Sequence, residues 1–178
     1  MNYSAIAVRY SKALYALANE RKLLDSVHED MKMLYSVCRN EPEFIRLLEY
    51  PVIPSSKKIE IFRILFKDKV KPETFRFLEM VAANRRESYL PAIIHAFIDR
   101  YKTGKGIKTV TITTVDPIDD SVRKIIGDEI KRHYNSGVEF IEQQDEKLIG
   151  GFILRIEDEQ YDASVASQLE KIKREFIK

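Results

Sequence analysis

The sequence has little cysteine, glycine or proline, and it has no long apolar run. One cysteine among 178 residues, Cys38, cannot form an internal disulfide or supply the thiolates of a structural zinc site, which indicates a reducing compartment. Six glycines and six prolines in a chain that is 44% hydrophobic exclude a disordered or collagen-like protein. Because no stretch of about 18 apolar residues exists and the first residues lack a basic-then-apolar leader, we expect neither membrane spanning nor secretion.

A large excess of one charge is also missing, but the charge is unevenly distributed. The 30 basic and 28 acidic residues leave a net charge of +2, too weak a field to indicate nucleic acid or anionic lipid as a partner. Residues 1–105 hold 19 of the basic and 13 of the acidic residues, whereas every glycine lies after residue 103. We therefore predict two domains, 1–105 and 106–178, joined at the polar, turn-prone segment 103–106.

Apolar residues in the first domain recur every three to four positions, which is typical of amphipathic helices. Ser55 or Ser56 is expected to cap the fourth helix, and Pro72 suits the first turn of the fifth. The predicted helices cover residues 4–20, 24–39, 41–48, 72–84 and 87–101, and the fourth, after its serine cap, carries Ile59, Phe62, Leu65 and Phe66. Six helices with short joints indicate an antiparallel, bundle-like domain.

The second domain changes to a pattern with strands. Residues 107–115 are almost all β-branched, which favours a strand because stiff χ1 angles suit a sheet. A helix after Pro117, two short strands at 138–141 and 152–156, and a helix at 162–177 complete a small α/β domain with a short mixed sheet. The chain as a whole is predicted to be an α+β protein.

Residues that could perform chemistry are sparse. The three histidines, His28, His95 and His133, lie far apart and without metal-ligand spacing, and Cys38 falls on an apolar helix face. The residues after Lys105 do not fit a phosphate-binding loop. We therefore predict no catalytic, cofactor or metal site, and a small enzyme built on Asp145 and Asp162 is the weakest of the hypotheses.

Two of the predicted helices, the first and the fifth, are apolar on almost all sides. They are either central in the bundle, or they flank an apolar groove that receives an amphipathic helix of another protein. A basic stretch between Lys57 and Arg76 supports a different function, that of an RNA-binding regulatory helical protein. Its phenylalanines have the spacing of core residues and do not alternate with the cations, so we favour no nucleic acid as a partner.

Four segments of the sequence carry a family signature: Arg9 to Tyr15, Leu48 with Pro51 to Ile53 followed by Lys57 and Lys58, Phe77 to Phe97 in part, and Asp145 and Leu148 to Gly151 followed by Ile156, Asp158, Asp162, Ser164, Val165 and Leu169. They resemble the delta subunit of bacterial F-type ATP synthase, the family of the oligomycin-sensitivity-conferring protein. The resemblance spans nearly the whole chain, although Glu146 and Lys147 replace the family's usual Pro and Ser.

The resemblance implies a peripheral-stalk, or stator, subunit that needs no cofactor and is not itself a catalyst. Its first and fifth helices would bind the N-terminal helix of an alpha subunit of the catalytic head, and its C-terminal domain would engage the end of the b-subunit stalk. It would resist rotor torque at the cytoplasmic face of a bacterial membrane, reached only through the complex. The implied alpha-binding residues are Ala7, Tyr10, Ala13, Leu14, Phe77, Met80, Val81 and Asn84, and the implied b-binding residues are Leu148, Ile149, Gly150, Gly151, Asp162 and Val165.

Overall fold

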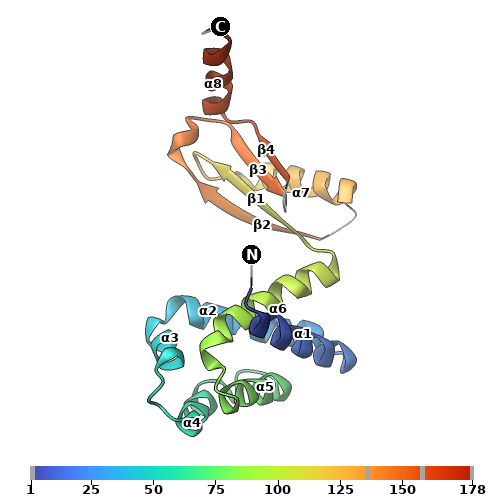
Figure 1. The fold of residues 1–178 in the computed structure, drawn as a ribbon. Coiled ribbons are helices and arrows are strands. Elements are labelled where there is room, and N and C mark those ends of the chain that lie inside the picture. Colours follow the sequence, from blue (N-terminus) through green and yellow to red (C-terminus); the bar gives the residue numbers. More distant parts are fainter. Residues whose placement is uncertain (1–2, 135–136, 157–158, 177–178) are drawn as a thin grey trace. The chain divides into compact units, whose positions relative to one another are not determined.

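The computed structural model describes residues 3–134, 137–156 and 159–176 and confirms the predicted α+β fold class. The chain divides into two compact units, Met1–Tyr101 and Lys102–Lys178. The first unit is helical, and the second contains a mixed sheet with two helices (Figure 1).

The helical elements lie close to their predicted positions. The fourth helix begins without a serine cap, because Pro54 occupies the cap position and Ser55 and Ser56 are its first two helical residues. The sixth predicted helix ends later than expected, because it continues through Thr103 and Gly104 of the expected linker. The elements are α1 (Ala5–Glu20), α2 (Leu24–Asn40), α3 (Pro42–Glu49), α4 (Ser55–Phe66), α5 (Pro72–Ala83), the 3-10 turn η1 (Glu87–Tyr89) and α6 (Leu90–Lys105).

The core of the first unit is made of the inward faces of these helices. Full burial of one such aliphatic or aromatic side chain contributes about 1.5–3 kcal/mol relative to exposure. Phe44, Phe62 and Phe66 form a cluster in which neighbouring ring centroids are 5.6–6.2 Å apart. Residues buried at the centre include Leu14, Met31, Leu34, Phe62, Leu78, Ile93, Ile94 and Phe97.

The first turn of α5 receives its cap from a distant helix. Asp30 of α2 is buried, and its Oδ2 accepts hydrogen bonds from the Lys71 backbone N–H at 2.8 Å and from the Thr74 hydroxyl at 2.6 Å. A carboxylate at a helix N-terminus satisfies otherwise unpaired N–H groups and interacts favourably with the helix dipole. This contact fixes where α5 begins relative to α2.

The second unit is a four-stranded sheet in the order β2-β1-β3-β4. β1 pairs parallel with β2 through the crossover helix α7, and antiparallel with β3, which pairs antiparallel with β4. β4 was not predicted, because all four of its residues are exposed and none supplies an apolar, inward-facing position. The elements are β1 (Lys108–Thr114), α7 (Asp120–Tyr134), β2 (Val138–Gln144), the 3-10 turn η2 (Glu146–Leu148), β3 (Phe152–Ile156), β4 (Glu159–Asp162) and α8 (Val165–Phe176).

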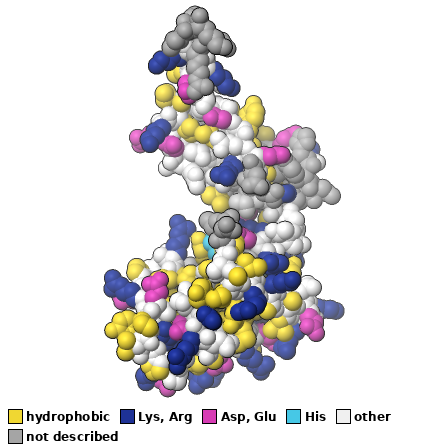
Figure 2. Space-filling model, viewed as in Figure 1, with side chains coloured by type: hydrophobic (Ala, Val, Ile, Leu, Met, Phe, Trp, Pro, Cys, Tyr) yellow, Lys and Arg dark blue, Asp and Glu magenta, His cyan; other side chains and the backbone are white. Residues whose placement is uncertain are grey.

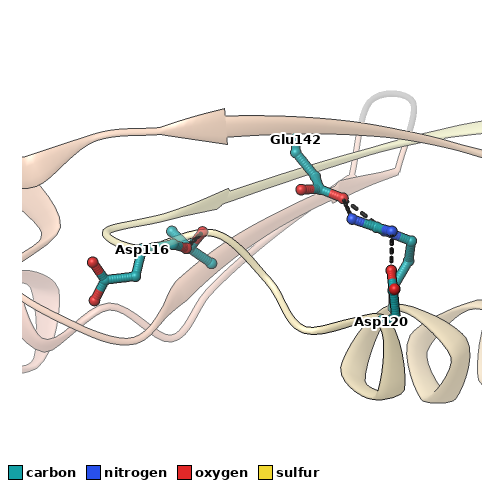
Figure 3. Close-up of polar contacts among 5 residues, drawn as sticks. Asp116, Asp120 and Glu142 are labelled. Atoms are coloured by element: carbon teal, nitrogen blue, oxygen red, sulfur yellow. Dashed lines mark hydrogen bonds and ion pairs between the residues drawn. The ribbon is translucent and has the colours of Figure 1, made fainter.

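Helix α7 packs against β2 on one face of the sheet. A Cβ atom added at Gly127 would lie 3.2 Å from the Phe140 ring, which shows how closely the helix approaches the strand. Arg123 joins the same elements, because its Nε donates to Glu142 Oε1 at 2.7 Å and its guanidinium also pairs with Asp120 (Figure 3). These contacts hold α7 against β2.

Candidate partner-binding surfaces

Side-chain contacts join α1 and the residue that follows it to α5. The rings of Tyr10 and Phe77 are edge to face, with centroids 6.3 Å apart and planes at 67°. Arg21, just after α1, forms an ion pair with Glu73 in the first turn of α5, with Nη1 and Oε1 3.2 Å apart. We call the surface along this junction the α1–α5 seam.

The eight residues expected at an alpha-subunit contact divide into two groups. Those that face the inside of the unit are fully or almost fully buried: Ala7, Leu14, Phe77 and Val81. Those that reach the surface are the half-buried Tyr10 and the exposed Ala13, Met80 and Asn84. The buried group can act on a partner only by holding the exposed group in place.

The outward side of α1 explains why the helix looked apolar all round. Ala5, Ala13 and Ala16 are exposed, and they are small enough to be tolerated by solvent while adding little polar character. Val8, which the sequence prediction did not include, is 40% exposed, and Met80 on α5 is 42% exposed. Exposed apolar side chains therefore occur on both helices of the seam.

Two cations lie close together on α1. Arg9 lies over the Tyr10 ring, with Cζ 5.8 Å from the ring centroid, and Lys12 on the same helix is exposed. Figure 2 shows hydrophobic side chains bordered by Lys and Arg on the face of the first unit where α1 lies. A helix that presents an apolar stripe with acidic neighbours would match this surface.

In the second unit, the Gly150–Gly151 turn holds the start of α8. Gly151 has φ +75°, and a Cβ atom there would lie 2.3 Å from the Ala163 carbonyl oxygen, so only glycine fits. The Val165 N–H donates to the Gly150 carbonyl at 3.0 Å. The strand β3 begins directly after this turn, at Phe152.

Asp162 organises the backbone that leads into α8. Its carboxylate accepts hydrogen bonds from the Ser167 hydroxyl at 2.6 Å and from the Ser164 N–H at 2.9 Å. The bond from Ser167, followed by those from Ser164, holds the pKa of the Asp162 carboxyl below its ordinary value. Asp162 and the Gly150–Gly151 turn together position α8. We call these three residues the base of α8.

The accessible apolar surface of this region lies mostly on α8 itself. Leu148 is buried, but Ile149 is 68% exposed and Val165 is 37% exposed. Leu169 and Ile172, at 52% and 48% exposure, continue the stripe that Val165 begins, one helical turn apart. The sequence prediction did not place these two residues at the stalk contact, although the spacing 165, 169, 172 is a readable signal.

The cysteine and the histidines, for which the sequence predicted no catalytic or metal-binding role, have the following surroundings. Burial raises the pKa of the Cys38 thiol to about 11, which makes it a poor nucleophile. His28 stacks on Tyr101, with ring centroids 3.7 Å apart, and His95 contacts the Tyr3 hydroxyl, while the side chain of His133 lies outside the described residues. Among residues 3–134, 137–156 and 159–176, no three His, Cys, Asp or Glu side chains gather as metal ligands would.

The basic stretch considered for RNA binding is partly occupied by ion pairs. Lys58 is buried against Glu87, and Lys57 and Arg63 pair with Glu60 and Glu79 on the surface. The remaining cations, Lys67, Lys69, Lys71 and Arg76, are exposed.

In the described part of the chain, no helix combines the length and apolarity that crossing a bilayer requires.

Comparison with known proteins gives one consistent result. The family model for the ATP synthase delta (OSCP) subunit matches residues 6–176. The chain is 36% identical to the ATP synthase subunit delta of Cytophaga hutchinsonii over 176 residues, covering 99% of this chain and 96% of that protein. It is 35% identical to the subunit of the same name from Lactobacillus johnsonii over 173 residues, covering 97% and 94%.

A solved structure supports the fold. A chain from the mitochondrial ATP synthase hexamer of Toxoplasma gondii superimposes with a TM-score of 0.76 at 20% identity, covering 98% of this chain and 99% of that chain.

Proposed function

Because the chain belongs to the ATP synthase delta (OSCP) family and is therefore a component of the peripheral stalk, we propose that its two units bind different subunits of that complex. The α1–α5 seam binds the N-terminal helix of an alpha subunit, and α8 with its base binds the C-terminal end of the b-subunit stalk. The family identification made from the sequence is confirmed. The two assignments of partners remain our proposal.

One observation carries the first assignment: two helices distant in sequence share a junction at which apolar side chains remain accessible. Tyr10 contacts buried Phe77 edge to face, and Met80, three positions further along α5, is 42% exposed. An amphipathic helix docks into such a surface with its apolar stripe, and large flexible side chains such as Met adapt to it. Exposed Ala13 leaves room for a partner backbone to approach α1.

The second assignment rests on α8. Leu169 and Ile172 are about half exposed on one side of a helix whose start is fixed by the glycine turn and Asp162. A helical partner could bury this stripe and extend the packing to Ile149. The implied residues Gly150, Gly151 and Asp162 would then contribute by positioning α8.

Such a two-ended connection has a mechanical purpose. The catalytic head would turn with the rotor unless it were tied to the stator, and the elastic energy of rotation would then not reach the nucleotide sites. An interface of roughly 1,200–2,000 Å² can reach nanomolar affinity, about 12 kcal/mol, and resistance to load depends mainly on its dissociation rate. This role requires no catalytic group or cofactor in the chain, and it places the protein at the cytoplasmic face of a bacterial membrane through the complex.

The first assignment is tested with a synthetic peptide of the alpha-subunit N-terminus. Titration calorimetry should show binding, and circular dichroism should show that the peptide becomes helical. Met80→Asp should reduce the affinity at least about 100-fold, since a charge would be buried at the contact. The matched control is Ile64→Asp, at a residue of α4 that is 83% exposed and is not among the residues assigned to the seam. Equal affinity in wild type and Met80→Asp would contradict the assignment.

The second assignment is tested with a C-terminal fragment of the b subunit. Leu169→Asp and Ile172→Asp should abolish its capture by the full chain, whereas Ile125→Asp, at an exposed residue of α7, should leave capture unchanged. Loss of capture in the Ile125→Asp control, or its persistence in the α8 variants, would direct the search to another face of the second unit.

A further inference from the structure

The first turn of α5 has no cap from its own sequence. Its N-cap residue, Lys71, makes no side-chain capping hydrogen bond, and the third helical residue is Thr74. In a capping box, a Glu or Gln at that third position accepts a hydrogen bond from the backbone N–H of the N-cap residue, and threonine is too short to do so. The start of α5 therefore depends on an acceptor from elsewhere in the unit.

Asp30 of α2 supplies this acceptor. Its Oδ2 receives the Lys71 N–H and the Thr74 hydroxyl, so that one oxygen fixes two points of the turn, the residue before the helix and the third residue within it. Asp30 is 9% exposed and Thr74 is fully buried, and water therefore competes little for these bonds. Hydrogen bonds to a carboxylate are also shorter and stronger than those between neutral groups.

A second contact reaches the same turn from the surface. Arg21, just after α1, pairs with Glu73, the neighbour of Thr74, but the two paired side chains are 48% and 20% exposed. Ion pairs in contact with solvent contribute little, because water screens the charges and holding two long side chains costs entropy. Asp30 is thus the stronger of the two anchors of this turn.

The position of the turn reaches the α1–α5 seam through the helix itself. Thr74 lies one turn before Phe77, and both belong to the buried face of α5. Phe77 meets the Tyr10 ring edge to face, and Met80 follows it on the same helix. Because a helix rises about 1.5 Å per residue, a slip of α5 by one residue's rise would displace Phe77 from Tyr10 by a similar distance.

We propose that Asp30 is a positioning residue for the partner contact. It sets where α5 lies against α1, and thereby the affinity of the seam, although it lies buried on α2. The place of its acceptor oxygen matters more than its charge, since that oxygen alone holds both donors. The effect on affinity rests on the proposed binding of an alpha-subunit helix to the seam.

Two substitutions separate the place of the oxygen from the charge. Asp30→Asn keeps an acceptor oxygen at the same distance from the backbone and removes the charge, so it should bind the alpha-subunit peptide within about threefold of wild type. Asp30→Glu keeps the charge but moves the carboxylate by one carbon–carbon bond, about 1.5 Å, and should weaken binding at least about tenfold. Asp30→Ala, which has no acceptor, should weaken binding at least as much.

Two controls separate positioning from a general loss of stability. Glu73→Gln removes the exposed ion pair from the same turn and should change the affinity less than about threefold. Phe44→Leu lowers the melting temperature through the cluster with Phe62 and Phe66, and it should leave the affinity of the folded protein unchanged. Calorimetric titrations are therefore made well below the melting temperature of every variant.

The position of α5 is also measured without a partner, by nuclear Overhauser effects (NOEs) between the Tyr10 and Phe77 rings in the full isotope-labelled chain. These NOEs should persist in Asp30→Asn and weaken in Asp30→Glu. If wild type fails to bind the peptide while the NOEs change as expected, the assignment of the partner is wrong and the positioning role stands.

Three results would overturn the positioning role. One is unchanged ring NOEs in Asp30→Glu and in folded Asp30→Ala. Another is peptide binding by these two variants that equals that of wild type. The third is loss of binding in Asp30→Asn with retention in Asp30→Glu, which would assign the effect to the charge at the helix N-terminus.

Discussion

The ring of Tyr10 on α1 covers the ring of Phe77 on α5 edge-on, at a centroid distance of 6.3 Å. Phe77 is 5% exposed and belongs to the core, whereas Tyr10 is half-buried and belongs to the surface. The pair therefore connects the packing of the first unit to the seam where we place the alpha-subunit helix. An edge-to-face pair of this kind contributes about 0.5–1.5 kcal/mol beyond the burial of its area.

Tyr10→Ala should weaken both the fold and the contact, because it removes the cover of Phe77 and a large part of the seam surface. We expect the free energy of unfolding to fall by about 1–2 kcal/mol and the affinity for the alpha-subunit peptide to fall at least about tenfold. Tyr10→Phe keeps the ring and should preserve both. Urea denaturation and calorimetry measure the two effects, and equal losses in the Phe and Ala variants would show that the hydroxyl matters instead of the ring.

Gly151→Ala should destabilise the second unit strongly, since the new methyl group would collide with the Ala163 carbonyl oxygen at 2.3 Å. Gly106→Ala is the matched control, because Gly106 also has positive φ, +65°, but a Cβ atom there meets nothing within 4 Å. The control should cost only the conformational strain, about 1–2 kcal/mol, and Gly151→Ala at least about 2 kcal/mol more. Hydrogen exchange of the β1 and β3 amides measures both; similar costs would show that the turn relaxes around the methyl group.

Asp162→Ala should loosen the first turn of α8. The Ser164 N–H and the Ser167 hydroxyl lose their acceptor, so the Ser164 amide, and with it the Ser167 amide that donates to the Ser164 hydroxyl, should exchange faster. Asp128→Ala, at an exposed position of α7, should leave both amides unchanged. Because the folded pKa of Asp162 lies below its ordinary value of 3.8, this stabilisation is fully present above pH 3.8 and is lost as the pH falls through the lowered pKa. A wild-type exchange profile at these amides that resembles the Ala variant at pH 6 would contradict the role.

Cys38 should react slowly with iodoacetamide. Burial raises its pKa from 9.0 to about 11, which reduces the thiolate fraction near pH 8 about 100-fold relative to an exposed thiol. The same chain unfolded in urea provides the reference rate. A native rate within about threefold of the unfolded rate would mean that α2 opens often enough to expose the thiol.

The sequence predicted most of the helices and strands, and it was wrong where an element depends on contacts distant in the sequence or contains residues typical of turns. Helices such as α2 and α5 carry long periodic patterns, so their bounds were found within one residue. β4 has four exposed residues and depends on pairing with β3, which no local pattern records. The C-terminal extension of α6 runs through Thr103 and Gly104, residues of low helix propensity that turn-based reasoning assigns to a linker.

For the proposed partner surfaces, the sequence pointed to helices but not to which of their side chains are exposed. The resemblance pointed to α1 and α5, yet it could not separate Leu14, which is buried, from Ala13, its exposed neighbour, because exposure depends on which helices pack nearby. The predicted stalk contact centred on the glycine turn and did not include the exposed side chains of Leu169 and Ile172 on α8. The contact of Asp30 with the first turn of α5 has no signal in the sequence around α5.

The cap that Asp30 gives to α5 has a consequence for inhibitor design. Since Asp30 lies more than forty positions before the helix it caps, a synthetic peptide copied from residues 71–84 would lack that carboxylate and, at this length, would be mostly unstructured in water. A peptide designed to compete for the proposed alpha-subunit helix would therefore have to include α2, or carry a chemical staple that holds it helical in place of the Asp30 cap.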